Sequence, residues 1–184
     1  MSTTLIIIVV VAVIVLWVIS VQRGLVGKDE NCKNAMSQIG VQQASRWDAL
    51  KALADLTKSY SEYEYKALTD IIAQRRPITA GSSAAEANAQ ENKIVEAFTH
   101  IMAVGEQYPQ LKSSETYIKT MDSVNLYENQ VRMSRMVYND SVTILNRSVR
   151  QFPASLVAGM LGFYVKEYLV ENTGKTEMPS MKLN

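Results

Sequence analysis

The sequence predicts an all-α protein, in which an N-terminal transmembrane helix is followed by an elongated antiparallel bundle of about four helices. Two observations lead to this prediction: an uncharged apolar run near the N-terminus, and apolar residues that recur at helical spacing through the rest of the chain. Outside the apolar run, the period-two alternation typical of strands is missing. The predicted organisation is a short tail (1–4), a transmembrane helix (5–22), a helical bundle domain (23–170) and a mobile polar tail (171–184).

The membrane anchor is predicted from the run between Leu5 and Ile19, in which every residue is apolar. A helix of about 20 residues is about 30 Å long, which matches the hydrocarbon core of a bilayer. Trp17 lies near the end of the run, where an indole favours the headgroup boundary, and Arg23 is the first charged residue. The lipid bilayer is therefore an expected partner, and we expect these anchor residues to face it: Leu5, Ile8, Val11, Val15, Trp17 and Val21.

A cleaved secretory signal is the competing interpretation of the same run. Such a signal needs a basic segment before the apolar run and a cleavage site with small residues after it. Residues 2–4 are Ser-Thr-Thr, and no such site follows Val18. The anchor is therefore favoured. The basic residues Arg23, Lys28 and Lys33 follow the run, so the positive-inside rule predicts a cytoplasmic C-terminal domain.

Composition excludes several classes of function. The 19 Lys and Arg residues nearly balance the 18 Asp and Glu residues, which predicts no nucleic-acid footprint. Cys32 is the only cysteine and His100 the only histidine, which is too few for a disulfide framework, a cysteine-rich zinc site or a carboxylate-bridged di-metal centre. Glu96 and His100 are one helical turn apart, a spacing more typical of a solvated contact than of a metal site. No acid, base and nucleophile converge, so we expect no enzyme and no cofactor.

The apolar pattern predicts the helices of the bundle. The first follows a stripe from Met36 to Ile71 and continues directly from the membrane helix, so that the two form one stiff post. Proline, glycine and serine between Arg75 and Ser83 predict a loop at the distal tip, and Tyr108-Pro109 predicts another stop. The predicted helices cover 28–74, 84–107, 113–151 and 153–169.

Polar residues recur beside the apolar stripe of the third predicted helix. If they face inward they must find hydrogen-bond partners, so a network that sets the register of the bundle is the favoured interpretation. A ligand-binding pocket is the alternative. The candidates for the network are Glu128, Arg132, Arg135, Asn139 and Asn146.

Two segments are candidates for a contact surface. Three tyrosines within six residues cannot share one helix face, so at least one of them should be exposed. The fourth predicted helix is apolar nearly all round, and it is a bundle core element, an oligomer interface or an interfacial membrane helix. We favour packing on the bundle or on a neighbouring subunit, because its polar face is thin and poor in Lys and Arg. The candidate contact residues are Tyr60, Tyr63, Tyr65, Leu156, Met160 and Phe163.

The chain resembles the LemA family from the anchor to Leu169, more closely in its second half than in its first. The resemblance is carried, in order, by EQYPQLK (106–112), LYENQV (126–131), RMVYNDSV (135–142), LNRSVRQFP (145–153) and GFY (162–164). It implies a bacterial membrane-anchored helical bundle in the inner (cytoplasmic) membrane or an intracellular membrane derived from it. Some members are associated with specialised membranes such as magnetosomes, and the family brings no catalytic residues.

Together these observations predict a noncatalytic, single-pass membrane-anchored scaffold or interaction protein. Self-association in the plane of the membrane is expected, because a stiff post, exposed aromatics and an over-apolar fourth helix suit lateral contacts. Further protein partners are unidentified. The alternative is a membrane-associated bundle that senses a ligand or lipid through a polar pocket on the third helix.

Overall fold

A computed structural model describes residues 3–170, which form six helices and contain no strand. The predicted all-α class is confirmed, as is an N-terminal helix long and apolar enough to cross a membrane. Thr3 and Thr4, predicted as part of a tail, already belong to the first helix. The mobile tail predicted for 171–184 lies outside the described residues.

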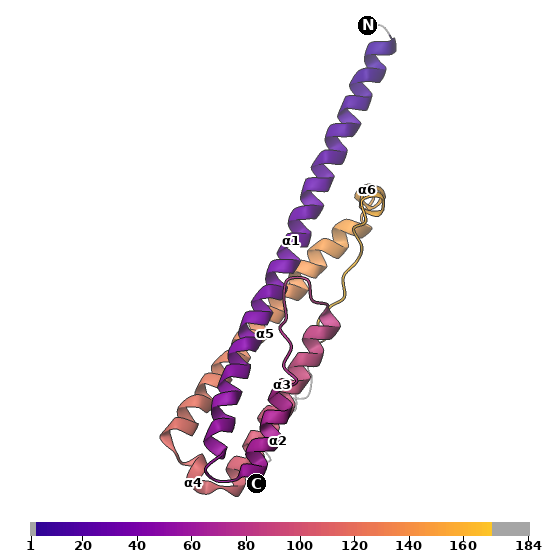
Figure 1. The fold of residues 1–184 in the computed structure, drawn as a ribbon. Helices are drawn as coiled ribbons and strands as arrows, with labels where there is room; N and C mark the ends of the chain where they lie inside the picture. The colour runs from indigo at the N-terminus through magenta and orange to yellow at the C-terminus, as the bar shows by residue number, and fades with distance from the viewer. Residues whose placement is uncertain (1–2, 171–184) are drawn as a thin grey trace, which may run out of the picture.

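Helix α1 (Thr3–Thr57) continues without a break from the apolar run into the bundle, as predicted (Figure 1). Its 55 residues make a rod about 80 Å long. Gly24 and Gly27 lie at the junction and cost about 1 kcal/mol each relative to alanine, which is too little to break a helix supported on both sides. The membrane segment and the first bundle helix are therefore one element.

The predicted unbroken helix over 28–74 is wrong, because α1 ends at Thr57 and α2 (Glu62–Ile72) returns antiparallel to it. Ser61 caps α2, its hydroxyl accepting a hydrogen bond from the backbone N–H of Glu64 at 3.3 Å. A serine followed three residues later by glutamate is a helix-start pattern. Here that pattern overrides the continuous apolar spacing.

Helices α3 (Ala84–Gln107) and α5 (Glu115–Arg150) complete the bundle, with the short α4 (Pro109–Lys112) between them. The bounds of α3 are those predicted, since a Ser83–Glu86 capping box starts it and Pro109 follows its end. Helix α5 begins two residues later than predicted. α1 and α3 run away from the membrane segment, whereas α2 and α5 run back toward it (Figure 1).

The predicted fourth helix, 153–169, is wrong in length: α6 covers only Ala154–Met160. Gly162 stops it, because its φ of 76° is in the left-handed region that glycine adopts without steric cost. Residues 163–170, which we call the return segment, then run back along α5 without helical structure (Figure 1).

The buried apolar residues form two clusters stacked along α1. The membrane-proximal core contains Leu25, Cys32, Ala35, Met36, Ile39, Ala84, Ala87, Tyr138, Val142, Leu145, Ala158 and Leu169. The distal core contains Trp47, Leu50, Leu53, Ala54, Leu68, Ile94, Ala97, Ile101, Val104, Leu111, Tyr117 and Val124. Helix α1 contributes to both, so it is the shared wall of the bundle.

The segment between α2 and α3 lies against the middle of α1 and not at the distal tip, where the sequence predicted it. A Cβ atom added at Gly40 would stand 2.0 Å from the backbone oxygen of Ile78. No real Cβ contact is that short, so this crossing requires glycine at position 40. The distal tip is formed instead by the α1–α2 turn and α4 (Figure 1).

Replacement of Gly40 by alanine should destabilise the bundle, because the backbone of Ile78 must move to admit the methyl group. We expect a loss of about 1–3 kcal/mol, measured as a lower Tm in detergent by circular dichroism. Gly24→Ala is the matched control, since open space surrounds that glycine and alanine favours the helix. Equal melting temperatures for Gly40→Ala and the wild type would contradict the close approach.

Candidate functional site

The apolar part of α1 stands clear of the bundle. Its most apolar stretch is not buried by any other described element, and the predicted anchor residues Leu5, Ile8, Val11, Val15 and Trp17 are all exposed. Val21 was predicted to face lipid, but it is half-buried against the membrane-proximal core. The apolar span therefore ends where the bundle begins.

Two asparagines of α5 bind the backbone of the return segment. The Asn139 amide donates to the carbonyl of Leu169 at 3.1 Å and accepts from its N–H at 2.9 Å. The Asn146 amide does the same with Lys166, at 2.9 and 2.8 Å. Each side chain satisfies both backbone groups of one residue, as a neighbouring β-strand would.

The spacing of these contacts follows from the geometry of the two chains. Asn139 and Asn146 are two helical turns apart, which is about 10.5 Å along α5. Lys166 and Leu169 are three residues apart, which is about 10 Å in an extended chain. The two amides can therefore hold a straight segment without strain in either element.

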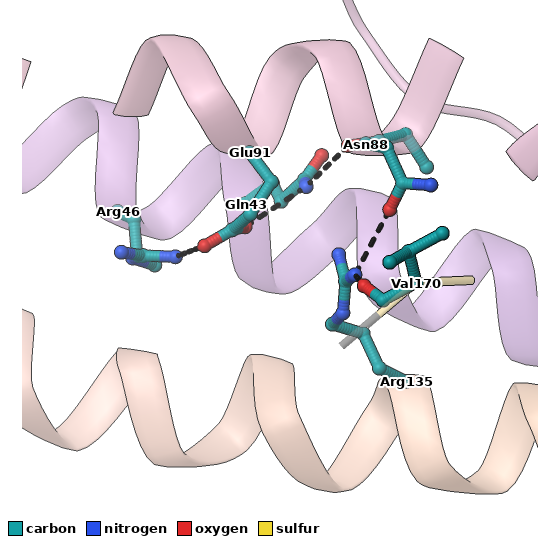
Figure 2. Close-up of polar contacts among 7 residues, drawn as sticks. Gln43, Arg46, Asn88, Glu91, Arg135 and Val170 are labelled. Atoms are coloured by element: carbon teal, nitrogen blue, oxygen red, sulfur yellow. Dashed lines mark hydrogen bonds and ion pairs between the residues drawn. The ribbon is translucent and has the colours of Figure 1, made fainter. Parts of the chain in front are cut away.

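Further contacts tie the return segment to the bundle. The Tyr138 hydroxyl donates to the carbonyl of Glu167 at 3.3 Å. The guanidinium of Arg135 donates to the side-chain oxygen of Asn88 at 2.9 Å and also to the carbonyl of Val170 (Figure 2). The end of the described chain is thus joined to α5 directly, and to α3 through Arg135.

Asp29 anchors the return segment to α1. Its carboxylate lies 2.8 Å from the Lys166 ammonium and 2.9 Å from that of Lys33. Burial alone would raise the pKa of Asp29, but hydrogen bonds and charge attraction from Lys166 and Lys33 outweigh it and lower the pKa. The carboxylate is therefore charged at neutral pH, and the ion pair crosses from the return segment to α1.

The predicted polar network of α5 is only partly brought together. Arg135, Asn139 and Asn146 turn toward the return segment and each donates a hydrogen bond to a backbone carbonyl there. Arg132 is exposed, and Glu128 is half-buried one turn before it. The side chains that could line a ligand pocket thus contact the chain's own backbone.

A buried polar layer between the two cores was missed by the sequence reasoning. The Arg46 guanidinium, with 2% of the residue exposed, lies 2.5 Å from a carboxylate oxygen of Glu91 on α3. The Gln43 amide donates to the other carboxylate oxygen of Glu91 and to the carbonyl of Ala87, both at 3.2 Å (Figure 2). Gln43, Arg46 and Glu91, which we call the polar layer, join α1 to α3.

The spacing of residues in α1 could have revealed this layer. On one face of α1 the buried apolar residues Met36 and Ile39 are followed by Leu50, and Trp47 is buried beside that face. The face therefore has a gap between Ile39 and Leu50. Gln43 and Arg46 fill that gap, at spacings of four, three and four residues. Polar residues on an otherwise apolar stripe predict buried polar groups that need partners.

The candidate contact residues differ in exposure. Tyr63 is 79% exposed and Tyr60 38%, although the Tyr60 ring also packs against Tyr108 with ring centroids 6.1 Å apart. Tyr65 is half-buried, and the Lys58 ammonium lies over its ring. In the C-terminal region, Leu156 and Met160 are exposed, whereas Phe163 is half-buried against the membrane-proximal core.

The two residues considered for chemistry have structural surroundings. His100 contacts Glu64 of α2 at 2.7 Å, while Glu96 pairs with Lys93 at 2.8 Å. Cys32 is buried in the membrane-proximal core, and burial raises the pKa of its thiol. A raised pKa disfavours the thiolate that nucleophilic chemistry requires.

An apolar helix that continues into a bundle, together with the return segment bound along α5, defines a helical-bundle protein whose N-terminal element is long and apolar enough to span a membrane. The particular family follows from comparison with known sequences. The chain belongs to the LemA family, whose model matches residues 35–183. That match covers the bundle from Ala35 onward and leaves out the apolar run and the first residues after it.

The curated relatives resemble one segment of this chain. The magnetosome proteins MamQ 2 and MamQ 1 of Paramagnetospirillum magneticum are each 33% identical to it over 75 residues, which is 41% of this chain and 28% of theirs. Magnetosome protein MamQ of Magnetospirillum gryphiswaldense is 32% identical with the same coverage. The chain thus matches less than a third of the length of these relatives.

Replacement of Asn146 by alanine should release the return segment locally, because the N–H and carbonyl of Lys166 lose their partner. Loss of such bonds costs about 1–3 kcal/mol, so hydrogen exchange at Lys166 should accelerate about tenfold or more. Exchange measured by mass spectrometry or NMR tests this. Asn129→Ala is the control, since Asn129 is exposed on the same helix. Unchanged protection at Lys166 would refute the role of the amide.

Proposed function

We propose that this protein is a noncatalytic, single-pass membrane-anchored helical scaffold that self-associates in the plane of the membrane. The proposal rests on the continuity of α1. Its apolar N-terminal part is exposed, and its remaining part, from Leu25 to Thr57, packs against the other helices of the bundle. Because the helix is continuous, the distance and the angle between the apolar span and the bundle are fixed.

The noncatalytic part of the proposal is supported by the partners of the interior polar groups. Arg46 is paired with Glu91, and Asn139 and Asn146 are hydrogen-bonded to backbone groups of the return segment. His100 is held by Glu64. Side chains that are engaged in structural bonds are not free to bind and transform a substrate.

Self-association is supported by an exposed apolar stripe on α5. Leu126, Met133, Val137 and Ile144 follow each other at steps of seven, four and seven residues, which places them on one face of the helix, and all four are exposed. Helix α5 runs alongside α1 (Figure 1), so the stripe is parallel to the anchor. A second copy anchored in the same bilayer would meet this stripe side by side.

The proposed location is the inner (cytoplasmic) membrane of a bacterium or an intracellular membrane derived from it, with the bundle in the cytoplasm. Arg23, Lys28 and Lys33 follow the apolar span and favour that side. The name magnetosome protein, carried by the relatives, is consistent with a role at a specialised membrane. An organising role at such a membrane is part of the proposal.

In mild detergent the full-length protein should be larger than a monomer by light scattering coupled to size exclusion, at all but the lowest concentrations. The double variant Met133→Asp, Val137→Asp should shift it to a monomer, because carboxylates cannot be buried without partners. Met102→Asp, at a comparably exposed methionine of α3, is the control. A wild-type protein that is monomeric at every concentration would rule out self-association.

The side of the membrane can be tested with an introduced cysteine. Cys32 is unsuitable, because its side chain is buried in the membrane-proximal core. A variant with Cys32→Ala and Asp140→Cys carries an exposed thiol on α5. We expect an impermeant maleimide to label it only after the cells are opened. Labelling of intact spheroplasts would reverse the proposed orientation.

A further inference from the structure

The corner formed by the end of α5 and α6 is an uncharged, exposed apolar surface. No charged residue occurs between Arg150 and Lys166. Within this stretch Met160 is 87% exposed, Phe152 76% and Leu156 62%. Apolar side chains exposed this fully and gathered in one place indicate a surface that is covered by another apolar phase.

This apolar corner lies at the height where the span of α1 ends. Ala158 of α6 packs in the same buried cluster as Leu25, and Val21 is half-buried against that cluster. Val21 is also the last apolar residue before Arg23, the first charge after the span. Helix α6 is therefore beside α1 at the boundary between the apolar span and the polar bundle.

The direction of α6 is consistent with a membrane surface. In Figure 1, α6 is seen nearly end-on, whereas α1 beside it is seen along its length. The axis of α6 therefore crosses the axis of α1. An element that crosses a spanning helix lies along the plane of the bilayer. Its buried side chains Val157 and Ala158 face the bundle, which leaves Leu156 and Met160 for the other side.

Cationic side chains are placed to meet lipid headgroups. Arg147 and Arg150 are exposed in the last turn of α5, next to the apolar corner, and Arg23 is exposed on α1. Arginine side chains at this level can reach phosphate groups while their apolar stems stay near the hydrocarbon. Helix α6 needs no cationic face of its own, because its inner face packs on the bundle and α5 supplies the charge.

We propose that α6, with Phe152 and Tyr164 at its flanks, inserts into the headgroup region of the leaflet through which α1 emerges on the bundle side. The occupant of this surface is the bilayer, because α6 packs beside α1 at the level where the apolar span ends. The contact presupposes the membrane anchor of the proposed function and adds a second point of attachment. The second point restricts rotation of the bundle about the axis of α1.

Depth-dependent fluorescence quenching tests this contact on the full chain. A variant with Cys32→Ala and Met160→Cys, labelled with NBD and reconstituted in phosphatidylcholine–phosphatidylglycerol vesicles, should emit at shorter wavelength than the same label in water. Lipids with a doxyl group near the headgroup should reduce its intensity at least twofold. Ser59→Cys, at the exposed distal turn, is the matched control and should emit as in water without quenching.

The arms of this experiment separate the possible failures. If the protein floats with the vesicles but the label at position 160 emits as in water and is not quenched, the second contact is overturned and the anchor is not. A blue-shifted but unquenched label whose shift disappears on dilution in lipid would show that a second copy covers α6, which also overturns the proposal. Protein that does not float with the vesicles would overturn the anchor itself, and the second contact with it.

Discussion

The uninterrupted hydrogen-bond ladder of α1 is the constraint on which the rest of the structure depends. Thr3 to Thr57 form one helix, so the apolar half that can cross a membrane and the half that lines both cores cannot rotate independently. Most of the stability of a helix in water comes from the packing of its apolar face and not from intrinsic propensity. The bundle therefore stabilises the same element that determines its position.

The polar layer has a different physical role from the two cores that it separates. Burial of Arg46 and Glu91 costs desolvation energy that their attraction offsets only in good geometry, so the pair is a weak source of net stability. Loss of one partner leaves an uncompensated buried charge, at a cost of about 3–5 kcal/mol. A shift of α3 by one turn along α1 would have the same effect. The pair therefore favours one register of α3 along α1 over the adjacent registers. Apolar contacts at Ile39 or Leu50 discriminate poorly between these registers.

Regular apolar spacing and cap residues allowed much of this fold to be predicted. The span, the bounds of α3 and the extent of α5 follow from periodicity, from the loop that ends at Ser83 and from Pro109. The turn after Thr57 was missed because the apolar stripe continues through it, and only Ser61 with Glu64 marks the new start. The return segment could not be predicted, since its backbone partners are side chains of α5 distant in sequence. Asn139 and Asn146 were recognised as inward-facing candidates, but periodicity does not reveal what an amide binds.

An unbroken α1 also acts as a lever. A span whose apolar length exceeds the bilayer thickness accommodates the difference by tilting. The part of α1 between Ser20 and Thr57 is about 55 Å long, so a tilt of about 10° moves the distal end of the bundle sideways by about 10 Å. Small differences in membrane thickness are thereby converted into displacements comparable to the diameter of a helix. The geometry of neighbouring bundles would then depend on the lipid composition around their anchors.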